Sequence, residues 1–201
     1  MTYHVHPMEK RHARQVAELH RSGISAGFLS SLGPSFLRQL YAALPSCPAA
    51  FGYVWERQDG EVLGFVACAR STGAVYKQSL VRRGLWMALP LARFLLRPSV
   101  IRRMIQTLRY PCQTAGDLPP AEVLSIVVGG AAQGQGVGKA LMAAAFEEFR
   151  RRGAPQVKVA VGADNEQANA FYRKCGFRLA VTREHHGLPM NIYVARLADG
   201  T

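Results

Sequence analysis

The stretch that most constrains the fold is a short apolar run that leads into a glycine-rich turn. The run is EVLSIVV, Glu122–Val128, and its β-branched and aliphatic residues predict a central strand buried on both faces. Small residues connect it to Gln133–Gly138 (QGQGVG), and a helix is expected from about Val137 to Arg152, ended by Gly153. A strand that feeds a helix through glycines brings backbone N–H groups and the helix dipole together. The turn is therefore a candidate anion site, and a plain strand–helix turn is the alternative.

Two familiar phosphate-binding motifs do not fit this turn. A Walker A loop would need Gly at position 133 and Ser or Thr at position 140, where this chain has Gln133 and Ala140. A dinucleotide fingerprint starting at Gly134 would need Gly or Ala at position 139, which is Lys139. The pattern that remains is Q-x-x-G-x-G, in which the missing side chains let the backbone wrap a pyrophosphate closely.

A second polar pattern lies further along the chain. Asn165, Asn169 and Tyr172 are spaced i, i+4 and i+7 on a short predicted helix, so they share one face. Asp164 or Asn165 would cap this helix, and Gly176 would end it. Two amides and a phenol on one face suit a polar, amide-rich ligand with a group to be protonated. A surface polar stripe, with the Tyr172 ring packed on the core, is the alternative.

The remaining pattern predicts one α/β domain over residues 1–201. Helices are expected at Lys10–Ser22 and Pro34–Leu44, with a loop rich in glycine and serine between them at Ser22–Gly33. A Gln-Asp-Gly link between two apolar runs indicates an antiparallel hairpin. The sheet should hold about seven strands, the last two joined by a His-Gly-Leu-Pro turn. Besides the central strand, these are Thr2–His6, Ala50–Arg57, Val62–Ala69, Gln156–Val161, Arg178–Glu184 and Asn191–Leu197.

Composition restricts the class of protein further. Apolar residues make up 49% of the chain, which fits a globular protein rather than a disordered one. The longest uncharged stretch, Gln39–Trp55, holds two prolines and is too short for a membrane-spanning helix. The N-terminus lacks the basic start and apolar core of a signal peptide. The four cysteines are scattered without a C-x-x-C pair, so we expect no metal site and a cytoplasmic location with reduced thiols.

The net charge of +12 is concentrated in one segment. Between Val62 and Gly116 there are nine basic residues and no acidic ones. An apolar stripe with arginines opposite it predicts two amphipathic helices, a basic helical insertion at about 72–116. One interpretation is that the stripe caps the domain's own core. The other is that residues 77–109 cover an acceptor cleft and bind an anionic partner or a membrane surface. Few interleaved aromatic residues and no recognisable motif argue against nucleic acid.

Taken together, the glycine-rich turn and the polar helix resemble the GNAT (GCN5-related N-acetyltransferase) superfamily. Its phosphate-binding motif Q/R-x-x-G-x-G/A matches Gln133–Gly138, and its following motif, N…N-A…F-Y…G-F, matches Asn165 to Phe177. The resemblance implies a mixed, mostly antiparallel sheet, split beside the central strand, with helices on both faces. It also implies acetyl-CoA as co-substrate, bound in the split.

The resemblance assigns co-substrate contacts to individual residues. Asn165 or Asn169 would hold the pantetheine arm, beside Tyr172. The main chain that would position the thioester and pantetheine is that of Ile126, Val127 and Val128. The residues that would bind the pyrophosphate are Gln133, Gly134, Gln135, Gly136, Val137, Gly138 and Lys139, although the Lys139 side chain has simple solvation as its alternative.

Two catalytic roles follow from the same resemblance. Tyr172 would protonate the departing thiolate, which is sensible chemistry because a phenol of pKa about 10 can donate to a thiolate whose acid has pKa about 8–9. Glu122 would take a proton from the incoming amine through a water, with a strand-end surface charge as its alternative. The expected reaction moves an acetyl or related acyl group onto a primary amine of a small molecule. Direct attack is expected, because no cysteine lies beside a base in the motifs.

Other interpretations stay open beside this one. A catalytically silent acyl-CoA-binding sensor, or an interaction module, is the alternative function. A homodimer is compatible with the sequence, as is a cytoplasmic protein held at the membrane periphery. His185 and His186 lie near the final hairpin, close to where substrates enter a fold of this kind, and His20 precedes the loop rich in glycine and serine. Ordinary structural roles are the alternative for all three. Cys175 is expected in the core.

Overall fold

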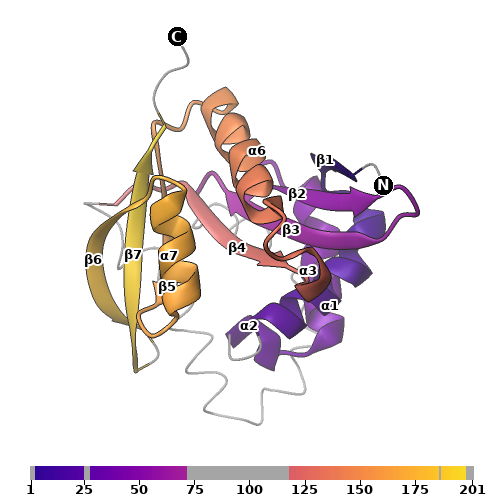
Figure 1. The fold of residues 1–201 in the computed structure, drawn as a ribbon, viewed down its shortest axis with the longest axis horizontal. Coiled ribbons are helices and arrows are strands. Elements are labelled where there is room, and N and C mark those ends of the chain that lie inside the picture. Colours follow the sequence, from indigo (N-terminus) through magenta and orange to yellow (C-terminus); the bar gives the residue numbers. More distant parts are fainter. Residues whose placement is uncertain (1–2, 25–27, 72–117, 186, 198–201) are drawn as a thin grey trace.

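The computed structural model describes residues 3–24, 28–71, 118–185 and 187–197 (Figure 1). The predicted basic insertion at 72–116 lies outside the described residues, and so does its division into two helices. Within the described part of the chain, no helix has the length and apolar character needed to cross a membrane.

Seven strands form one sheet in the order β1-β2-β3-β4-β5-β7-β6. Neighbouring strands are antiparallel except β4 and β5, which run parallel. This is the mixed, mostly antiparallel sheet that the family resemblance implied, so the predicted fold class is confirmed. The strands are β1 (Tyr3–Pro7), β2 (Ala50–Arg57), β3 (Val62–Ala69), β4 (Glu122–Val128), β5 (Gln156–Gly162), β6 (Arg178–His185) and β7 (Leu188–Arg196).

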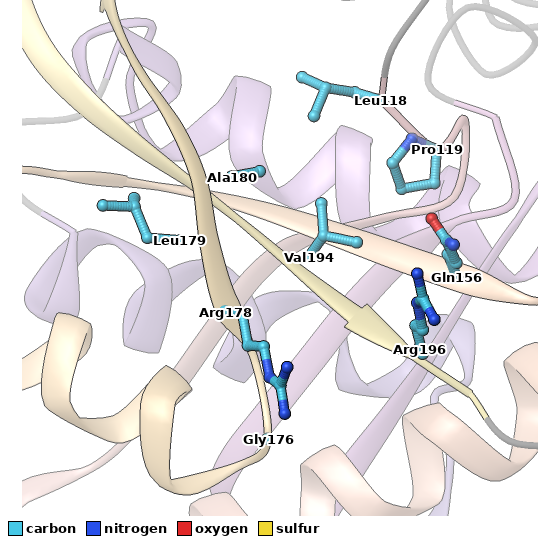
Figure 2. A pocket seen from close by; sticks show the side chains of 9 residues that line it. All are labelled: Leu118, Pro119, Gln156, Gly176, Arg178, Leu179, Ala180, Val194 and Arg196. Atoms are coloured by element: carbon cyan, nitrogen blue, oxygen red, sulfur yellow. The ribbon is translucent and has the colours of Figure 1, made fainter.

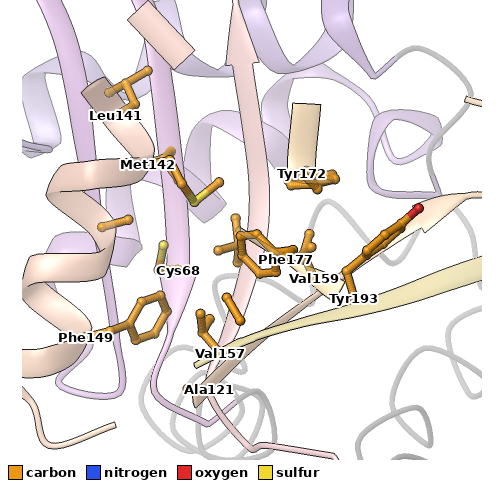
Figure 3. Packing of buried hydrophobic residues seen from close by; sticks show 14 of the residues in the cluster. Cys68, Ala121, Leu141, Met142, Phe149, Val157, Val159, Tyr172, Phe177 and Tyr193 are labelled. Carbon is orange, nitrogen blue, oxygen red and sulfur yellow. The ribbon is translucent and has the colours of Figure 1, made fainter. Parts of the chain in front are cut away.

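Helices cover both faces of this sheet (Figure 1). α1 (Ala13–Gly23) and α3 (Pro34–Ala43) pack on one face, which we call the α1/α3 face. α6 (Val137–Arg151) and α7 (Glu166–Lys174) pack on the other, the α6/α7 face, and Figure 3 shows the buried cluster beneath them. Short helical turns are η1 (Lys10–His12), α2 (Phe28–Ser31), η2 (Leu44–Ser46) and η3 (Gly130–Ala132).

The sheet is split between β4 and β5. These strands pair only where β4 begins, Glu122 with Lys158 and Val123 with Val159. A β-bulge follows on β4, because Ser125 and Val123 pair with adjacent residues of β3 and leave Leu124 as the extra residue. Leu124 is 39% exposed, and beyond it β4 diverges from β5 (Figure 1). The split beside the central strand is therefore present, and it opens toward the turn that leads into α6.

Most predicted elements lie within a residue or two of the observed ones, and three local details differ. The predicted loop Ser22–Gly33 includes α2 and the end of α1. The predicted His-Gly-Leu-Pro turn is too long, because β7 begins at Leu188, which already pairs with His185. Of the two candidate caps, it is Asn165 that caps α7, since its Oδ1 accepts a hydrogen bond from the Ala168 N–H (3.0 Å).

The C-terminal end of α6 is held by a buried carboxylate. Glu148 accepts hydrogen bonds from Arg151 Nε and Nη2 (both 2.7 Å) and from Arg152 Nε (2.6 Å). Arg152 also donates to the Pro48 carbonyl (3.0 Å) and lies over the Phe51 ring, 4.6 Å from its centroid. The Arg151 and Arg152 guanidinium groups lower the pKa of Glu148 to about 2 against the opposing effect of burial. This cluster fastens α6, and hence the turn before it, to the start of β2.

Replacing Glu148 with glutamine should lower the free energy of unfolding at pH 7 by about 1–3 kcal/mol, since it removes the charge of a buried carboxylate that pairs with the part-buried Arg152. Because the folded-state pKa is depressed, this stabilisation is present above the ordinary pKa of 4.5 and is lost as pH falls toward about 2. Urea unfolding at pH 7 and pH 3 measures both effects. Glu147→Gln is the matched control, because Glu147 is exposed and pairs with Arg150 alone among the described residues. Equal losses in the two variants would contradict the assignment.

Candidate functional site

Two glutamine side chains shape the turn between β4 and α6. Gln133 Nε2 donates a hydrogen bond to the Val128 carbonyl (3.1 Å), and Gln135 Nε2 donates to the Ala131 carbonyl (2.9 Å). Both side chains are exposed on the turn. Gln133, the glutamine of the Q-x-x-G-x-G pattern, thus stabilises the loop through a hydrogen bond to its main chain, and its side-chain amide is not directed at a ligand site.

The glycines of this turn are required for two different reasons. Gly134 and Gly136 have φ of +75° and +80°, in the left-handed region that glycine favours, and a Cβ on either would meet nothing within 4 Å. Gly138 has an ordinary φ, but a Cβ there would lie 3.1 Å from Phe171 Cε2, so it lets α6 approach α7 closely. Open space therefore lies over the turn at Gly134 and Gly136.

The first turn of α6 faces that open space. Its N-cap is Gly136, which has no side chain to accept hydrogen bonds from the first N–H groups of the helix. Lys139 is exposed one turn along. Uncapped N–H groups, the positive end of a 15-residue helix and a nearby ammonium group together favour an anionic ligand.

The part of β4 predicted to position a thioester lies between the bulge and this turn. Ile126 and Val128 are half-buried on the α6/α7 face. Val127 is buried on the α1/α3 face, where α1 comes so close that a Cβ on Gly23 would lie 2.5 Å from Val127 Cγ1. No pair joins these three residues to β5. One edge of their main chain thus borders the split.

Tyr172 lies on α7 with its ring in the core beneath the α6/α7 face (Figure 3). Its ring centroid is 5.4 Å from that of Phe171, 5.7 Å from Phe177 and 6.5 Å from Tyr193. The side chain is buried, and this burial, reinforced by the nearby Cys175 and Cys68 thiols, raises the pKa of the phenol well above its usual value. Tyr172 therefore keeps its proton at neutral pH and is able to act as an acid.

The two asparagines of the polar helix have different surroundings. Asn165 is exposed at the N-cap of α7, whereas Asn169 is buried and uses every polar position of its amide. Asn169 Nδ2 donates to the Gly162 and Asn165 carbonyls (2.8 and 2.7 Å). Its Oδ1 accepts from Asn191 Nδ2 and the Tyr193 hydroxyl (both 2.9 Å). The Asn169 amide thus fastens α7 to β5 and β7. Its contact with a pantetheine arm stays a prediction, and Asn165 is the exposed one of the two candidates.

Glu122 lies at the closed end of the split, not on the surface. It is buried, 3.5 Å from Lys158 Nζ, and Lys158 in turn donates a hydrogen bond to the Pro119 carbonyl (2.6 Å). Lys158 is on the neighbouring strand and directly opposite Glu122 in register. The alternative of a strand-end surface charge is thus excluded, and the role of Glu122 as a base stays a prediction.

A buried polar chain that the sequence did not predict connects α1, α3 and β4. His20 Nδ1 lies 2.6 Å from the Tyr41 hydroxyl, which lies 3.1 Å from Ser125 Oγ. The sequence pattern indicates His20 as a candidate functional residue, whereas it does not indicate Tyr41 or Ser125. The signal available in the sequence was a serine inside an otherwise apolar central strand.

The other candidate residues are less informative. Cys175 is half-buried, and burial raises the pKa of its thiol. The side chains of His185 and His186 lie outside the described part of the chain.

One group of side chains in the described residues has the composition of a metal site. Donor atoms of His6, His12 and Glu56 lie within 4.8 Å of one another. His12 Nδ1, however, accepts a hydrogen bond from the Glu9 N–H (2.9 Å), so in the neutral ring Nε2 carries the hydrogen and has no lone pair for a metal. Both Glu56 oxygens also bind Arg11, at 2.5 and 3.0 Å. The cluster is explained by hydrogen bonds that join β1, η1 and β2.

A surface cavity of about 640 Å³ lies over β5, β6 and β7, beside Leu118 and Pro119 (Figure 2). Gln156, Arg178 and Arg196 supply its polar groups, and Val194 contributes to its apolar lining. None of the residues predicted to bind co-substrate or to catalyse lines this cavity. It is therefore separate from the glycine-rich turn.

Comparison with known families identifies a match over most of the chain. The model of the Acetyltransferase (GNAT) family matches residues 21–177. A curated relative, mycothiol acetyltransferase of Saccharomonospora viridis, is 45% identical over 67 residues, which are 33% of this chain and 22% of that protein. The match thus spans less than a quarter of the relative's length.

Solved structures share the fold over nearly the full chain. A GCN5-related N-acetyltransferase from Kribbella flavida superimposes with a TM-score of 0.64 and 19% identity, covering 96% of this chain and 97% of that one. PaiA N-acetyltransferase from Thermoplasma acidophilum, solved in complex with coenzyme A, gives a TM-score of 0.61 and 13% identity, covering 98% and 99%. At these identities the likeness concerns the fold.

Proposed function

This chain belongs to the acetyltransferase (GNAT) family, and we propose that it transfers an acetyl or related acyl group from coenzyme A to a primary amine of a small molecule. The observation that carries the proposal is the split beside β4, which opens toward the glycine-rich turn at the start of α6. A catalytically silent acyl-CoA sensor remains the alternative.

The turn fits the pyrophosphate of acetyl-CoA. Gly134 and Gly136 leave space over the loop, and the N-terminus of α6 has no side-chain cap, so backbone N–H groups are available to a doubly charged anion. Gln133 and Gln135 hold the loop in shape. We assign pyrophosphate binding to the main chain of Gln133–Lys139, with Asn165 as the candidate for the pantetheine arm.

The chemistry is assigned to residues along the split. When bound, acetyl-CoA supplies the thioester carbonyl that the amine attacks. The main chain of Ile126–Val128 positions the thioester, and Tyr172 donates its proton to the leaving sulfur. Burial keeps the Tyr172 phenol protonated until transfer, and by raising the pKa it also makes the phenol a weaker acid than one in water. Glu122 is the first candidate for the base, in its ion pair with Lys158.

The acceptor and the partners of the chain stay proposals. Amino acids, polyamines, aminoglycosides, amino sugars and protein amines all present the required nucleophile. The segment shared with mycothiol acetyltransferase makes up 22% of that protein, so the acceptor of this chain is open. An anionic partner or membrane surface at 77–109, a homodimer and a cytoplasmic location are predictions that depend on residues or partners outside the described structure.

Isothermal titration with acetyl-CoA should give a Kd in the micromolar range. CoA release should then be measured against lysine, spermidine, kanamycin, glucosamine and a peptide with a free N-terminus. Binding with turnover of at least one amine supports the enzyme, whereas binding without any turnover supports the sensor. A folded protein that gives no heat with acetyl-CoA would overturn both.

A further inference from the structure

His20, Tyr41 and Ser125 form a continuous chain of polar groups through the core of the α1/α3 face. Their side chains come from α1, α3 and β4, and the residues are 2%, 2% and 8% exposed. The Phe65 ring stacks on His20 at 6.4 Å and meets Tyr41 edge-on at 5.2 Å, so both rings are fixed in place. His20 Nε2 is buried and has no hydrogen-bond partner in the described part of the chain. Three polar side chains from three separate elements thus converge where the core is otherwise apolar.

The hydrogen atoms of this chain have a preferred direction. A phenol is the stronger donor and an imidazole nitrogen the stronger acceptor, so the Tyr41 hydroxyl donates to His20 Nδ1. Burial lowers the pKa of His20 to about 4, which keeps the ring neutral and able to accept. The Tyr41 oxygen is then free to accept from the Ser125 hydroxyl. Each hydroxyl hydrogen points toward His20, and the Ser125 oxygen keeps a lone pair at the other end.

The Ser125 end of the chain belongs to a residue whose main chain lies where the sheet opens. Ser125 is the residue directly after the bulged Leu124, and the last pair between β4 and β5 is at Val123. Ser125 faces α3, whereas Tyr172 lies beneath α7 on the opposite face of the sheet. A proton donor thus lies under one face of the sheet, and a proton-accepting chain begins on the other face, from the strand that borders the split. Attack on a thioester needs both, because the nitrogen must lose a proton while the sulfur gains one.

We propose that Ser125, Tyr41 and His20 relay the proton that the acceptor amine loses during acyl transfer. The inference rests on the proposed function. The free amine forms its bond to the thioester carbonyl carbon, and the carbon–sulfur bond breaks. The nitrogen proton passes to Ser125 Oγ, the Ser125 proton to the Tyr41 oxygen, and the Tyr41 proton to His20 Nδ1. The sulfur takes the Tyr172 proton. After transfer, the His20 proton returns through Tyr41 and Ser125 to water in the split, and Tyr172 regains a proton from water.

A weakly basic imidazole is sufficient for this step. As the carbon–sulfur bond breaks and the carbonyl re-forms, a nitrogen that still holds its extra proton becomes that of an N-protonated amide, which is a much stronger acid than an alkylammonium ion. His20 therefore needs to accept the proton only for the duration of transfer, and its burial favours passing the proton on. Ser125 lies on the part of β4 that has separated from β5, whereas Glu122 lies at the closed end of the split beside the Lys158 ammonium group.

A pair of variants with the same shape isolates the Ser125 hydroxyl. Ser125→Thr keeps the hydroxyl and Ser125→Val replaces it with a methyl group, while both add the same bulk to β4. The readout is the single-turnover rate of acyl transfer from acetyl-CoA to the amine of the panel above with the highest kcat/KM. Ser125→Val should be roughly 10²-fold slower than Ser125→Thr, with the acetyl-CoA Kd equal within about twofold.

A second variant tests the other end independently. His20→Asn keeps an acceptor near the Nδ1 position but cannot take a proton, so a loss of about 10²-fold is expected although the hydrogen bond to Tyr41 is preserved. The rate of the wild type in mixtures of H2O and D2O should show more than one proton in transfer, and that of Ser125→Val fewer. Packing alone would not change this isotope dependence.

The outcomes distinguish a failure of the relay from a failure of the proposed function. Equal rates for Ser125→Val, Ser125→Thr and His20→Asn, in folded proteins that bind acetyl-CoA, would overturn the relay and leave the proposed function intact. A wild type that binds acetyl-CoA but acetylates no amine would overturn the relay together with the enzyme. Slow Ser125→Val and His20→Asn with a fast Ser125→Thr would support it.

Discussion

Replacing Tyr172 with phenylalanine is expected to lower kcat by roughly 10²- to 10³-fold while the Kd for acetyl-CoA changes by less than about twofold. Phenylalanine keeps the ring that packs against Phe171, Phe177 and Tyr193. The hydroxyl is lost, and with it the proton for the leaving sulfur. Since burial raises the pKa of Tyr172, the wild-type rate should also show no loss from deprotonation of this group through the mildly alkaline range. CoA release from pH 6 to 9.5 and isothermal titration measure the two effects.

Tyr193→Phe is the matched control for this experiment. Tyr193 is equally buried in the same aromatic cluster, but its hydroxyl donates to Asn169 and accepts from Arg173 Nη1 (3.1 Å). Removing the Tyr193 hydroxyl should lower the melting temperature and change kcat little. If Tyr172→Phe instead lost affinity and rate in equal proportion, Tyr172 would be a binding residue and the acid would have to be sought elsewhere.

Placing an aspartate at Gly136 should weaken acetyl-CoA binding by about 100-fold, or about 2.7 kcal/mol. Aspartate is a favourable N-cap residue, and it tolerates the left-handed backbone that Gly136 adopts better than most residues. The variant should therefore fold. Its carboxylate would, however, extend into the open space where the pyrophosphate is proposed to lie, and would occupy the first N–H groups of α6. Isothermal titration measures the change.

The opposite end of the same helix offers the control. Gly153 also has a left-handed φ, of +72°, and open space around its Cβ, so Gly153→Asp introduces similar backbone strain and the same charge. It should leave the Kd for acetyl-CoA within about twofold. Weaker binding in both variants by the same factor would mean that helix stability or net charge, rather than a pyrophosphate at the turn, determines affinity.

The fold was predictable because its signals are local. The strands β2, β3 and β4 begin and end at the predicted residues, since alternating or continuous apolar runs are bounded by turn residues. The glycine-rich turn and α6 followed from a short contiguous pattern. The limits of β7 were less accurate, because Pro189 at a strand start resembles a turn residue in the sequence.

The site was predictable only in part, for a physical reason. Asn169 and Tyr172 share a helix face, as their spacing required, but spacing does not say what lies opposite. The partners of Asn169 are on β7, so the same residue that suggested a ligand contact proved to be a fastening between elements. Ser125 and Tyr41 are 84 residues apart, and no local pattern connects them. Their contact exists only because α3 packs on the α1/α3 face of the sheet.

Few residue pairs join β4 to β5, and this weak link divides the molecule into two parts. The turn, α6 and β1–β4 lie on one side of the split, and the β6–β7 hairpin reaches the rest of the sheet through β5. Since only two residue pairs link β4 to β5, the two parts are kept in position mainly by side-chain packing, which tolerates compensating substitutions better than a continuous strand ladder would. Under the proposed function, the pyrophosphate-binding turn lies on one side of the split, whereas Asn165 and Tyr172 lie on the other. A substitution that shifts one side against the other would then change where the thioester lies relative to Tyr172.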